Sequence, residues 1–287
     1  KTVVKITNQD FEAKMRELRV NSDIAVAVSG GPDSLSLMHL SNRYALNNNI
    51  NLTVLSIDHG IRAESSKEIV WLKKVAKKNK INFYSTKLKK KINSSNTLSK
   101  ARTLRYEALS KYCNKKKIKF LLTAHHLDDE IENFLMRLIR GSGVKGLSSL
   151  KVKSRYKNTK LILVRPLLEY SKKSLVAYLS EQKQVYINDR TNYNNKYDRS
   201  RIRKLSQQLI HEGLSKVRFK NVLKNLKSAD TAINTAVSNY LEEQVKSCTF
   251  VGQKGVVNIQ SENKISKPNK TKNLAISKNW TKFIEHY

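Results

Sequence analysis

Residues 24–40 combine three patterns that together indicate one kind of fold. A continuous apolar run, Ile24–Val28, has the length of a buried strand, and the loop Ser29-Gly-Gly-Pro-Asp-Ser34 follows it directly. Leucines and a methionine then recur at helical spacing from residue 35 to residue 40. A strand, a glycine loop and a helix in immediate succession predict the first unit of an α/β domain.

The same alternation continues along the chain. Apolar runs predict further strands at 52–57, 81–84, 120–124 and 162–164, and helical spacing predicts helices at 64–79, 98–118 and 128–140. Strands that alternate with helices of this length are typical of a doubly wound, Rossmann-like parallel sheet. Such sheets bind ligands beyond the carboxyl ends of their strands. Three of these ends carry polar residues, at Ser29–Ser34, Asp58–His59 and His125–Asp129, so we expect the site there.

The C-terminal part has a different pattern. Helices are expected near 171–182, 199–211 and 216–247, followed by a strand near 256–259 and a polar linker at 262–279. We therefore predict a catalytic domain over 1–213 and a smaller, mostly helical second unit over 214–287. The second unit is expected to contact a macromolecular partner, and it is either a short form or truncated.

The chain is strongly basic, and its charge is unevenly distributed. With 56 Lys and Arg against 23 Asp and Glu, the net charge is +33. Residues 67–120 and 151–287 carry the excess, whereas 28–66 and 121–150 have a net charge of −1 each. A polyanionic partner such as nucleic acid explains this balance. A compositional bias toward Lys (41) and Asn (27) is the alternative.

Several protein classes are excluded by what the sequence lacks. Cys113 and Cys248 are isolated, so neither a disulfide framework nor a Cys-x-x-Cys metal site is expected. No apolar run reaches the length of a membrane span, and the start of the sequence lacks the basic-then-apolar pattern of a signal peptide. We expect a cytoplasmic protein without membrane contact, and the sequence leaves a homodimer open.

The loop after the first strand has the properties of a phosphate site. Its members are Ser29, Gly30, Gly31, Pro32, Asp33 and Ser34. The glycines allow an anion to approach the backbone, and the helix that follows supplies free N–H groups. Asp33 would repel phosphate unless Mg²⁺ lies between them, since Mg²⁺ binds carboxylate and phosphate oxygens together. The alternative is an ordinary strand-to-helix turn with proline in the first turn. The Walker A pattern is absent.

A second group of candidate residues lies at the start of the helix expected at 128–140. Asp129 and Glu132 are three residues apart and so share one helix face. We assign Asp129 and His125 to positioning the phosphate ligand and its Mg²⁺, and Glu132 to a cationic substrate. Alternatively, these carboxylates only complement the helix dipole. Gly141-Ser-Gly-Val-Lys-Gly146 fits a dinucleotide pattern, but it follows a helix rather than a strand.

Several blocks carry a resemblance to a known family. The loop Ser-Gly-Gly-x-Asp-Ser resembles the pyrophosphate loop of the ATP pyrophosphatase (PP-loop) superfamily. Within it, the chain resembles the tRNA(Ile)-lysidine synthetase family over about residues 20–205. The matching blocks are Ile57–Arg62, Ala101–Tyr106, Thr123–Glu132, Arg137–Leu147, Arg165–Leu168, Asp189–Asn192 and Arg199–Arg203. Arg190, Thr191 and Glu130 depart from the usual pattern of the family.

The resemblance implies a fold, a reaction and its partners. The fold would be of the adenine nucleotide alpha hydrolase type, and ATP with Mg²⁺ would adenylate carbon 2 of the wobble cytidine in an isoleucine tRNA with a CAU anticodon. Free L-lysine would then displace AMP. Asp33 and Asp129 would bind Mg²⁺ through the phosphates of ATP, and Arg105 would stabilise charge that develops during adenylation.

Other residues are assigned by position in the same way. Asp58 and His59 end a strand beside the loop, and we assign them to the nucleotide pocket. Arg199, Arg201 and Arg203 are assigned to tRNA or to an ATP phosphate, the alternative being a solvated helix face. Two other functions remain open: thiolation of tRNA, whose enzymes carry paired cysteines, and RNA binding without catalysis.

Overall fold

The protein is described here from a computed structural model, which covers residues 5–58, 65–87, 97–148, 150–188, 198–247, 250–252 and 255–257. Six strands form the main sheet, in the order β3-β2-β1-β4-β6-β5. They are β1 (Ile24–Ala27), β2 (Leu52–Asp58), β3 (Asn82–Lys87), β4 (Phe120–Leu122), β5 (Lys153–Arg155) and β6 (Ile162–Val164). All pairs are parallel except β5 with β6. The mostly parallel α/β sheet predicted from the sequence is confirmed.

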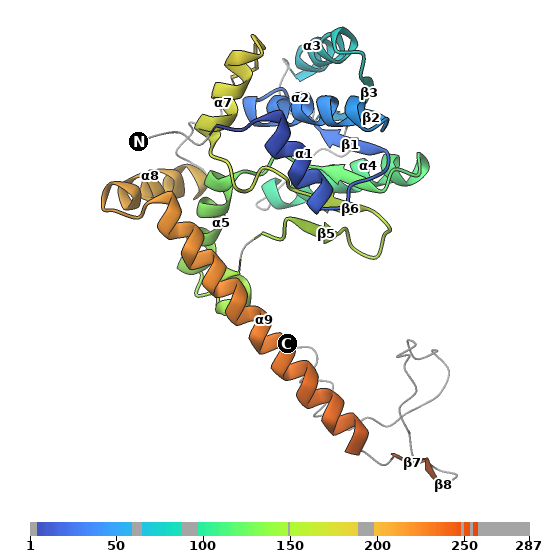
Figure 1. Cartoon of the computed structure of the whole chain (residues 1–287), viewed down its shortest axis with the longest axis vertical. Coiled ribbons are helices and arrows are strands. Elements are labelled where there is room, and N and C mark those ends of the chain that lie inside the picture. Colours follow the sequence, from blue (N-terminus) through green and yellow to red (C-terminus); the bar gives the residue numbers. More distant parts are fainter. Residues whose placement is uncertain are drawn as a thin grey trace. The chain divides into compact units, whose positions relative to one another are not determined.

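Helices follow most of the strands, as Figure 1 shows. They are α1 (Asn8–Glu17), α2 (Pro32–Asn47), α3 (Ser65–Lys78), α4 (Thr97–Lys115), α5 (Leu127–Ile139), α6 (Val144–Leu147), α7 (Lys172–Glu181), α8 (Asp198–His211) and α9 (Lys216–Ser247). A second, two-stranded sheet pairs β7 (Phe250–Gly252) with β8 (Gly255–Val257) in antiparallel orientation.

The two faces of the sheet have separate apolar cores. Ile24 and Val26 point to one face, where they pack with buried side chains of α1, α2, α3 and α7. Ala25 points to the other face, where it packs with Leu109 and Cys113 of α4. Alternate residues of a strand point to opposite faces, so a strand buried on both sides must be apolar throughout. The continuous apolar runs of the sequence have this cause.

The order in which strands are added to the sheet reverses between β1 and β4, which are parallel neighbours. The helix α2 leaves β1 over one face, whereas α4 enters β4 over the other, so the carboxyl ends of β1 and β4 border a crevice. The two sequence segments with the most polar chemistry, 29–34 and 123–129, follow these two strands directly.

A third apolar core lies outside the sheet. Ile131 and Leu135 of α5 pack there with Ile202 of α8 and with Phe219 and Leu223 of α9. Contacts divide the chain into two compact units, Lys1–Asp230 and Thr231–Tyr287. The boundary expected from the sequence is at residue 213, whereas in the structure the first turns of α9 belong to the first unit, where Phe219 and Leu223 are buried.

Most predicted elements match the structure to within a few residues. The helix expected at 216–247 has these bounds, and the strand expected at 81–84 continues to Lys87. The helix α1 and the edge strand β5 were not predicted, since both are short and rich in charged residues. The polar linker expected at 262–279 lies outside the described residues.

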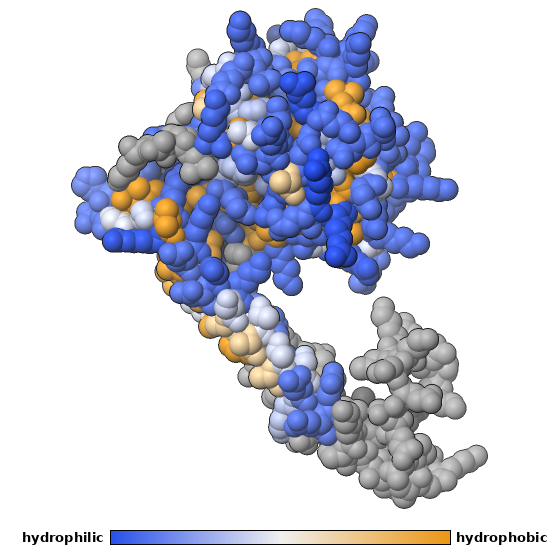
Figure 2. Space-filling view, viewed as in Figure 1, coloured by the Kyte–Doolittle hydropathy of each residue, from blue (hydrophilic) through white to orange (hydrophobic). Residues whose placement is uncertain are grey.

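The surface of the first unit is polar over most of the face seen in Figure 2. Apolar side chains are exposed along the later turns of α9, at Ile233, Val237 and Tyr240. Among the described residues, no helix combines the length and the apolar character needed to cross a membrane.

Candidate active site

The loop between β1 and α2 is held in shape by its own polar groups. The hydroxyl of Ser34 donates to the Gly31 carbonyl at 3.0 Å and accepts the Ser29 N–H at 3.2 Å. Gly31 is the N-cap of α2, without a side chain that could occupy the free N–H groups of the first turn. These donors therefore remain available to an anion, together with the positive end of the helix dipole.

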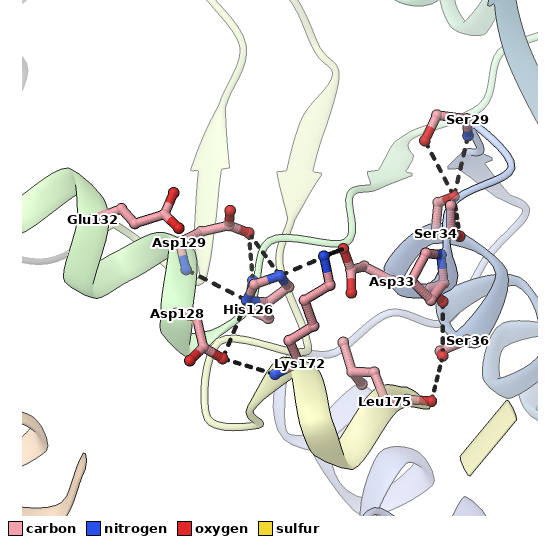
Figure 3. Close-up of polar contacts among 12 residues, drawn as sticks. Ser29, Asp33, Ser34, Ser36, His126, Asp128, Asp129, Glu132, Lys172 and Leu175 are labelled. Atoms are coloured by element: carbon pink, nitrogen blue, oxygen red, sulfur yellow. Dashed lines mark hydrogen bonds and ion pairs between the residues drawn. The ribbon is translucent and has the colours of Figure 1, made fainter. Parts of the chain in front are cut away.

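The first turns of α2 and α7 are tied to each other. The hydroxyl of Ser36 is fully buried and lies 2.9 Å from the Pro32 carbonyl and 3.0 Å from the Leu175 carbonyl. Since Pro32 begins α2 and Lys172 begins α7, this contact brings two helix N-termini to the same crevice. Figure 3 shows the two helix starts on one side of the site.

On the other side of the crevice, a histidine begins α5. His126 is the N-cap residue, and its Nδ1 accepts the N–H of Asp129 at 3.4 Å. The Asp129 carboxylate in turn accepts the backbone N–H of His126 at 3.1 Å. This reciprocal capping box leaves the ring hydrogen of a neutral His126 on Nε2.

The Nε2 atom of His126 joins the two sides of the crevice. It lies 3.5 Å from Asp33 Oδ2 on α2 and 3.5 Å from Asp129 Oδ2 on α5, as Figure 3 shows. Burial of the ring lowers its pKa, but the carboxylates of Asp33, Asp129 and Asp128 raise it by more, so the net pKa of His126 is raised.

Asp128 is occupied by structural contacts. Its Oδ1 accepts the Lys216 ammonium at 2.8 Å, and its Oδ2 accepts the Lys172 backbone N–H at 2.7 Å. Burial would raise the pKa of Asp128, yet the Lys216 ammonium and the Lys172 N–H outweigh it and lower the pKa. Asp128 thus fixes the start of α5 to the starts of α7 and α9.

Glu132 is paired with Arg203. The Arg203 Nε donates to Glu132 Oε1 at 2.7 Å, and the glutamate side chain is only 5% exposed. The bond to Glu132 raises the pKa of Arg203 although partial burial of the guanidinium opposes this. Glu132, which we assigned to a cationic substrate, is therefore paired with a cation of the protein itself. Arg203, which we assigned to tRNA, is bound to a carboxylate.

Asp33 has the one feature here that fits a metal ion. Its Oδ1 is buried and has no hydrogen-bond partner among the described residues. A buried acceptor without a donor is costly. Carboxylate oxygens of Asp33 and Asp129 both lie within 3.5 Å of His126 Nε2, so they are no more than 7 Å apart. Two carboxylates beside a phosphate loop are a ligand set that suits Mg²⁺.

His125 and Arg105 lie on the α4 side of the crevice. His125 Nδ1 is 3.0 Å from the Thr123 hydroxyl, and its Nε2 is 3.4 Å from an Nη atom of Arg102. The guanidinium of Arg105 lies 5.4 Å from the ring centre of Tyr106. Their assignment to ATP stays a prediction.

The remaining assigned residues are spread more widely. Asp58, buried at the end of β2, accepts the hydroxyls of Ser65 and Ser66 at 2.7 and 3.5 Å. Arg201 is exposed on α8. His59 and the side chain of Arg199 lie outside the described residues. Roles for all of these in nucleotide or tRNA binding therefore stay predictions.

Three residues at the crevice were missed by sequence reasoning. His126 contacts Asp33, Lys172 approaches Asp33, and Lys216 binds Asp128. Lys172 follows the Arg165-Pro-Leu-Leu168 block closely, so its neighbourhood was a usable signal. Nothing in the local sequence of Lys216 distinguishes it from many other lysines.

Comparisons with known proteins identify chains of similar sequence. Curated relatives called tRNA(Ile)-lysidine synthase include one from Rickettsia bellii (strain OSU 85-389), 44% identical over 66% of this chain and 44% of the relative. Others come from Rickettsia akari (strain Hartford), 38% identical over 79% and 52%, and Rickettsia conorii (strain ATCC VR-613 / Malish 7), 36% identical over 84% and 50%. The chain thus spans about half the length of these relatives.

A solved structure and a family model define the fold further. The U34-tRNA thiolase from Methanococcus maripaludis has a TM-score of 0.64 and 21% identity, over 77% of this chain and 78% of the other, which is a likeness of fold. The model of the PP-loop domain matches residues 4–209, most of the chain. The chain therefore belongs to the PP-loop domain family.

Proposed function

We propose that this chain is the ATP-dependent catalytic part of a tRNA(Ile)-lysidine synthetase. It would join free L-lysine to carbon 2 of the wobble cytidine in an isoleucine tRNA with a CAU anticodon. The observation that carries the proposal is the contact of His126 with Asp33 and Asp129 beside the 29–34 loop. The names of the Rickettsia relatives support the same reaction.

The loop and the two aspartates account for the nucleotide. The phosphates of ATP would accept the free N–H groups of α2, and Asp33 and Asp129 would hold Mg²⁺ against them. Bound Mg²⁺ would neutralise negative charge on the phosphates. Because His126 lies between the two carboxylates, it limits their repulsion before the nucleotide arrives.

In the first step, the oxygen on carbon 2 of the cytidine attacks the α-phosphorus of ATP. The bond from this phosphorus to the bridging oxygen breaks, and its electron pair leaves with pyrophosphate. Arg105 and His125 are the residues we assign to the developing charge on the α-phosphate. Most of the acceleration would come from holding ATP and the cytidine in line.

In the second step, the side-chain amine of lysine displaces AMP from carbon 2. Free lysine is protonated at neutral pH, and reaching the neutral amine costs about 4–5 kcal/mol. Glu132 and Asp129 are on one face of α5, so together they can attract an ammonium and accept its proton. Arg203 already neutralises Glu132, so lysine must compete with it for this carboxylate.

The experiment combines the protein with ATP, labelled lysine and total tRNA, and omits each in turn. Label should enter isoleucine tRNA only when all three are present, and Asp33→Asn should reduce it to background. Asp23→Asn is a matched control, because Asp23 is exposed and bonds only to Asn51 among the described residues. Incorporation without ATP, or into all tRNAs alike, would refute the assignment.

Thiolation of tRNA is the second candidate function, and it requires different side chains in the site. A thiolase would need paired cysteines, whereas Cys113 lies on α4 and is fully buried in the core against the sheet. The same assay distinguishes the two reactions, because a thiolase would require a sulfur donor and would leave lysine unincorporated.

A further inference from the structure

Lys172 reaches into the crevice from the first residue of α7. Its Nζ lies 3.9 Å from Asp33 Oδ2, and its backbone N–H is fixed by Asp128. Figure 3 shows its side chain extended between the starts of α5 and α2. Lys172 is thus a basic side chain that approaches the phosphate loop itself.

A lysine is an unexpected residue at this position of a helix. The N-terminus of a helix carries a partial positive charge, so a cation in the first turn is unfavourable. The neighbouring Ser171 already caps α7 by accepting the Ser174 N–H at 3.2 Å. The charge of Lys172 therefore does not stabilise the start of α7, and the group that its ammonium faces is the more informative property.

The other basic residues at the cluster are more firmly bound. Arg203 holds Glu132 at 2.7 Å and Lys216 holds Asp128 at 2.8 Å, both within hydrogen-bond distance. The ammonium of Lys172 is 3.9 Å from Asp33 and its side chain is 44% exposed, which is too far for a hydrogen bond. Its backbone is fixed, but its ammonium is free to turn toward a stronger anion.

We propose that Lys172 binds the β- and γ-phosphates of ATP and stabilises pyrophosphate as it leaves. This inference rests on the proposed binding of ATP at residues 29–34. Asp33 is in the first turn of α2, so an ammonium 3.9 Å from its carboxylate is already beside the phosphate cradle. A lysine ammonium is a compact charge with three donors, and it commonly binds phosphate.

The charge balance of the first step explains why a cation is needed there. Cleavage transfers an electron pair to the bridging oxygen, so negative charge on pyrophosphate increases as the bond breaks. A fixed positive group stabilises this transition state more than it stabilises bound ATP. Lys172 transfers no proton in this step, so it acts as a charge rather than as an acid.

The test measures binding of Mg²⁺–pyrophosphate, Mg²⁺–ATP and AMP by calorimetry, without tRNA or lysine. Lys172→Met should weaken binding of pyrophosphate and ATP by about 10-fold or more, whereas AMP, which lacks these phosphates, should bind normally. Lys172→Arg should restore most of the affinity. The matched control is Lys173→Met, because Lys173 is the next residue of α7 and is exposed.

Each outcome has a definite meaning. Wild-type affinity of Lys172→Met for pyrophosphate would overturn the inference, and so would an equal loss of AMP binding, which indicates a general distortion. Failure of the wild-type protein to bind ATP or pyrophosphate would overturn both the inference and the proposed function. If Lys172→Met loses pyrophosphate while wild type never incorporates lysine, only the proposed function fails.

Discussion

The side chain of Ile187 occupies the place that a side chain on Gly30 would need. A Cβ atom at Gly30 would lie 2.6 Å from Ile187 Cδ1, and the Ile187 N–H donates to the Gly30 carbonyl at 2.9 Å. Gly30 also has a φ of +89°, a backbone angle that residues with a side chain rarely adopt. The segment after α7 thus packs directly on the phosphate loop.

Gly30→Ala should therefore damage the loop in two ways. The positive φ costs about 1–3 kcal/mol for a residue with a Cβ, and contact with Ile187 displaces the loop. We expect a lower free energy of unfolding in urea and binding of ATP weakened by at least about 10-fold. In the double variant with Ile187→Ala, only the contact is relieved, so stability should return in part. Full recovery would show that backbone strain is unimportant.

Asp128→Asn should destabilise the first unit by about 1–2 kcal/mol, because it weakens the bonds to Lys216 and Lys172. Lys216→Met should have a similar effect, and the double variant should lose less than the sum of the two. Urea unfolding of the four proteins measures this coupling. Additive losses would mean that the 2.8 Å contact contributes nothing.

The same pair predicts a dependence on pH. Since the pKa of Asp128 is lowered from its usual 3.8, its contribution to stability is present above that value and is lost as the pH falls through the lower folded-state pKa. The difference in stability between wild type and Asp128→Asn should therefore be constant near neutral pH and shrink in acid. A difference that grows in acid would contradict the assigned direction.

Cys113 should be unreactive in the folded protein. It is fully buried against the sheet, and burial raises the pKa of its thiol to about 12. Alkylation requires the thiolate, which is then scarce at pH 8. Mass spectrometry after iodoacetamide treatment should find Cys113 modified only in concentrated guanidinium chloride. Rapid labelling under native conditions would mean that α4 separates from the sheet easily.

RNA binding should depend steeply on salt if the charge of +33 serves a polyanion. Neutralising about four phosphates together predicts a loss of about 100-fold in affinity between 50 and 200 mM salt. The helix α3 exposes five lysines that could contribute, at positions 67, 73, 74, 77 and 78. Filter binding of tRNA over this range is the measurement. An affinity for tRNA that does not change with salt concentration would favour compositional bias as the source of the charge.

Much of the fold was predictable because buried strands leave a strong signal. The runs at 24–28 and 52–57 are apolar on both faces, so the parallel sheet followed from them. β5 could not be found this way. It is an edge strand of three residues, Lys153–Arg155, held by pairing with β6 rather than by its own burial.

The site was predictable to the level of strand ends but not of individual side chains. Parallel topology brings the segments after β1 and β4 together, as expected. Which histidine of the His125-His126 pair faces Asp33 depends on the backbone turn after β4, and no periodicity fixes that turn. The Glu132–Arg203 pair joins residues 71 positions apart, so it requires knowledge of how α8 packs on α5.

His126 has a consequence for how the site assembles. It caps α5 through Nδ1 and holds the two aspartates through Nε2. The first turn of α5 therefore cannot fray without separating Asp129 from Asp33. Local unfolding at this helix end and loss of the ligand set are one cooperative event. Nucleotide binding should accordingly slow hydrogen exchange in a helix that belongs to the opposite wall of the crevice.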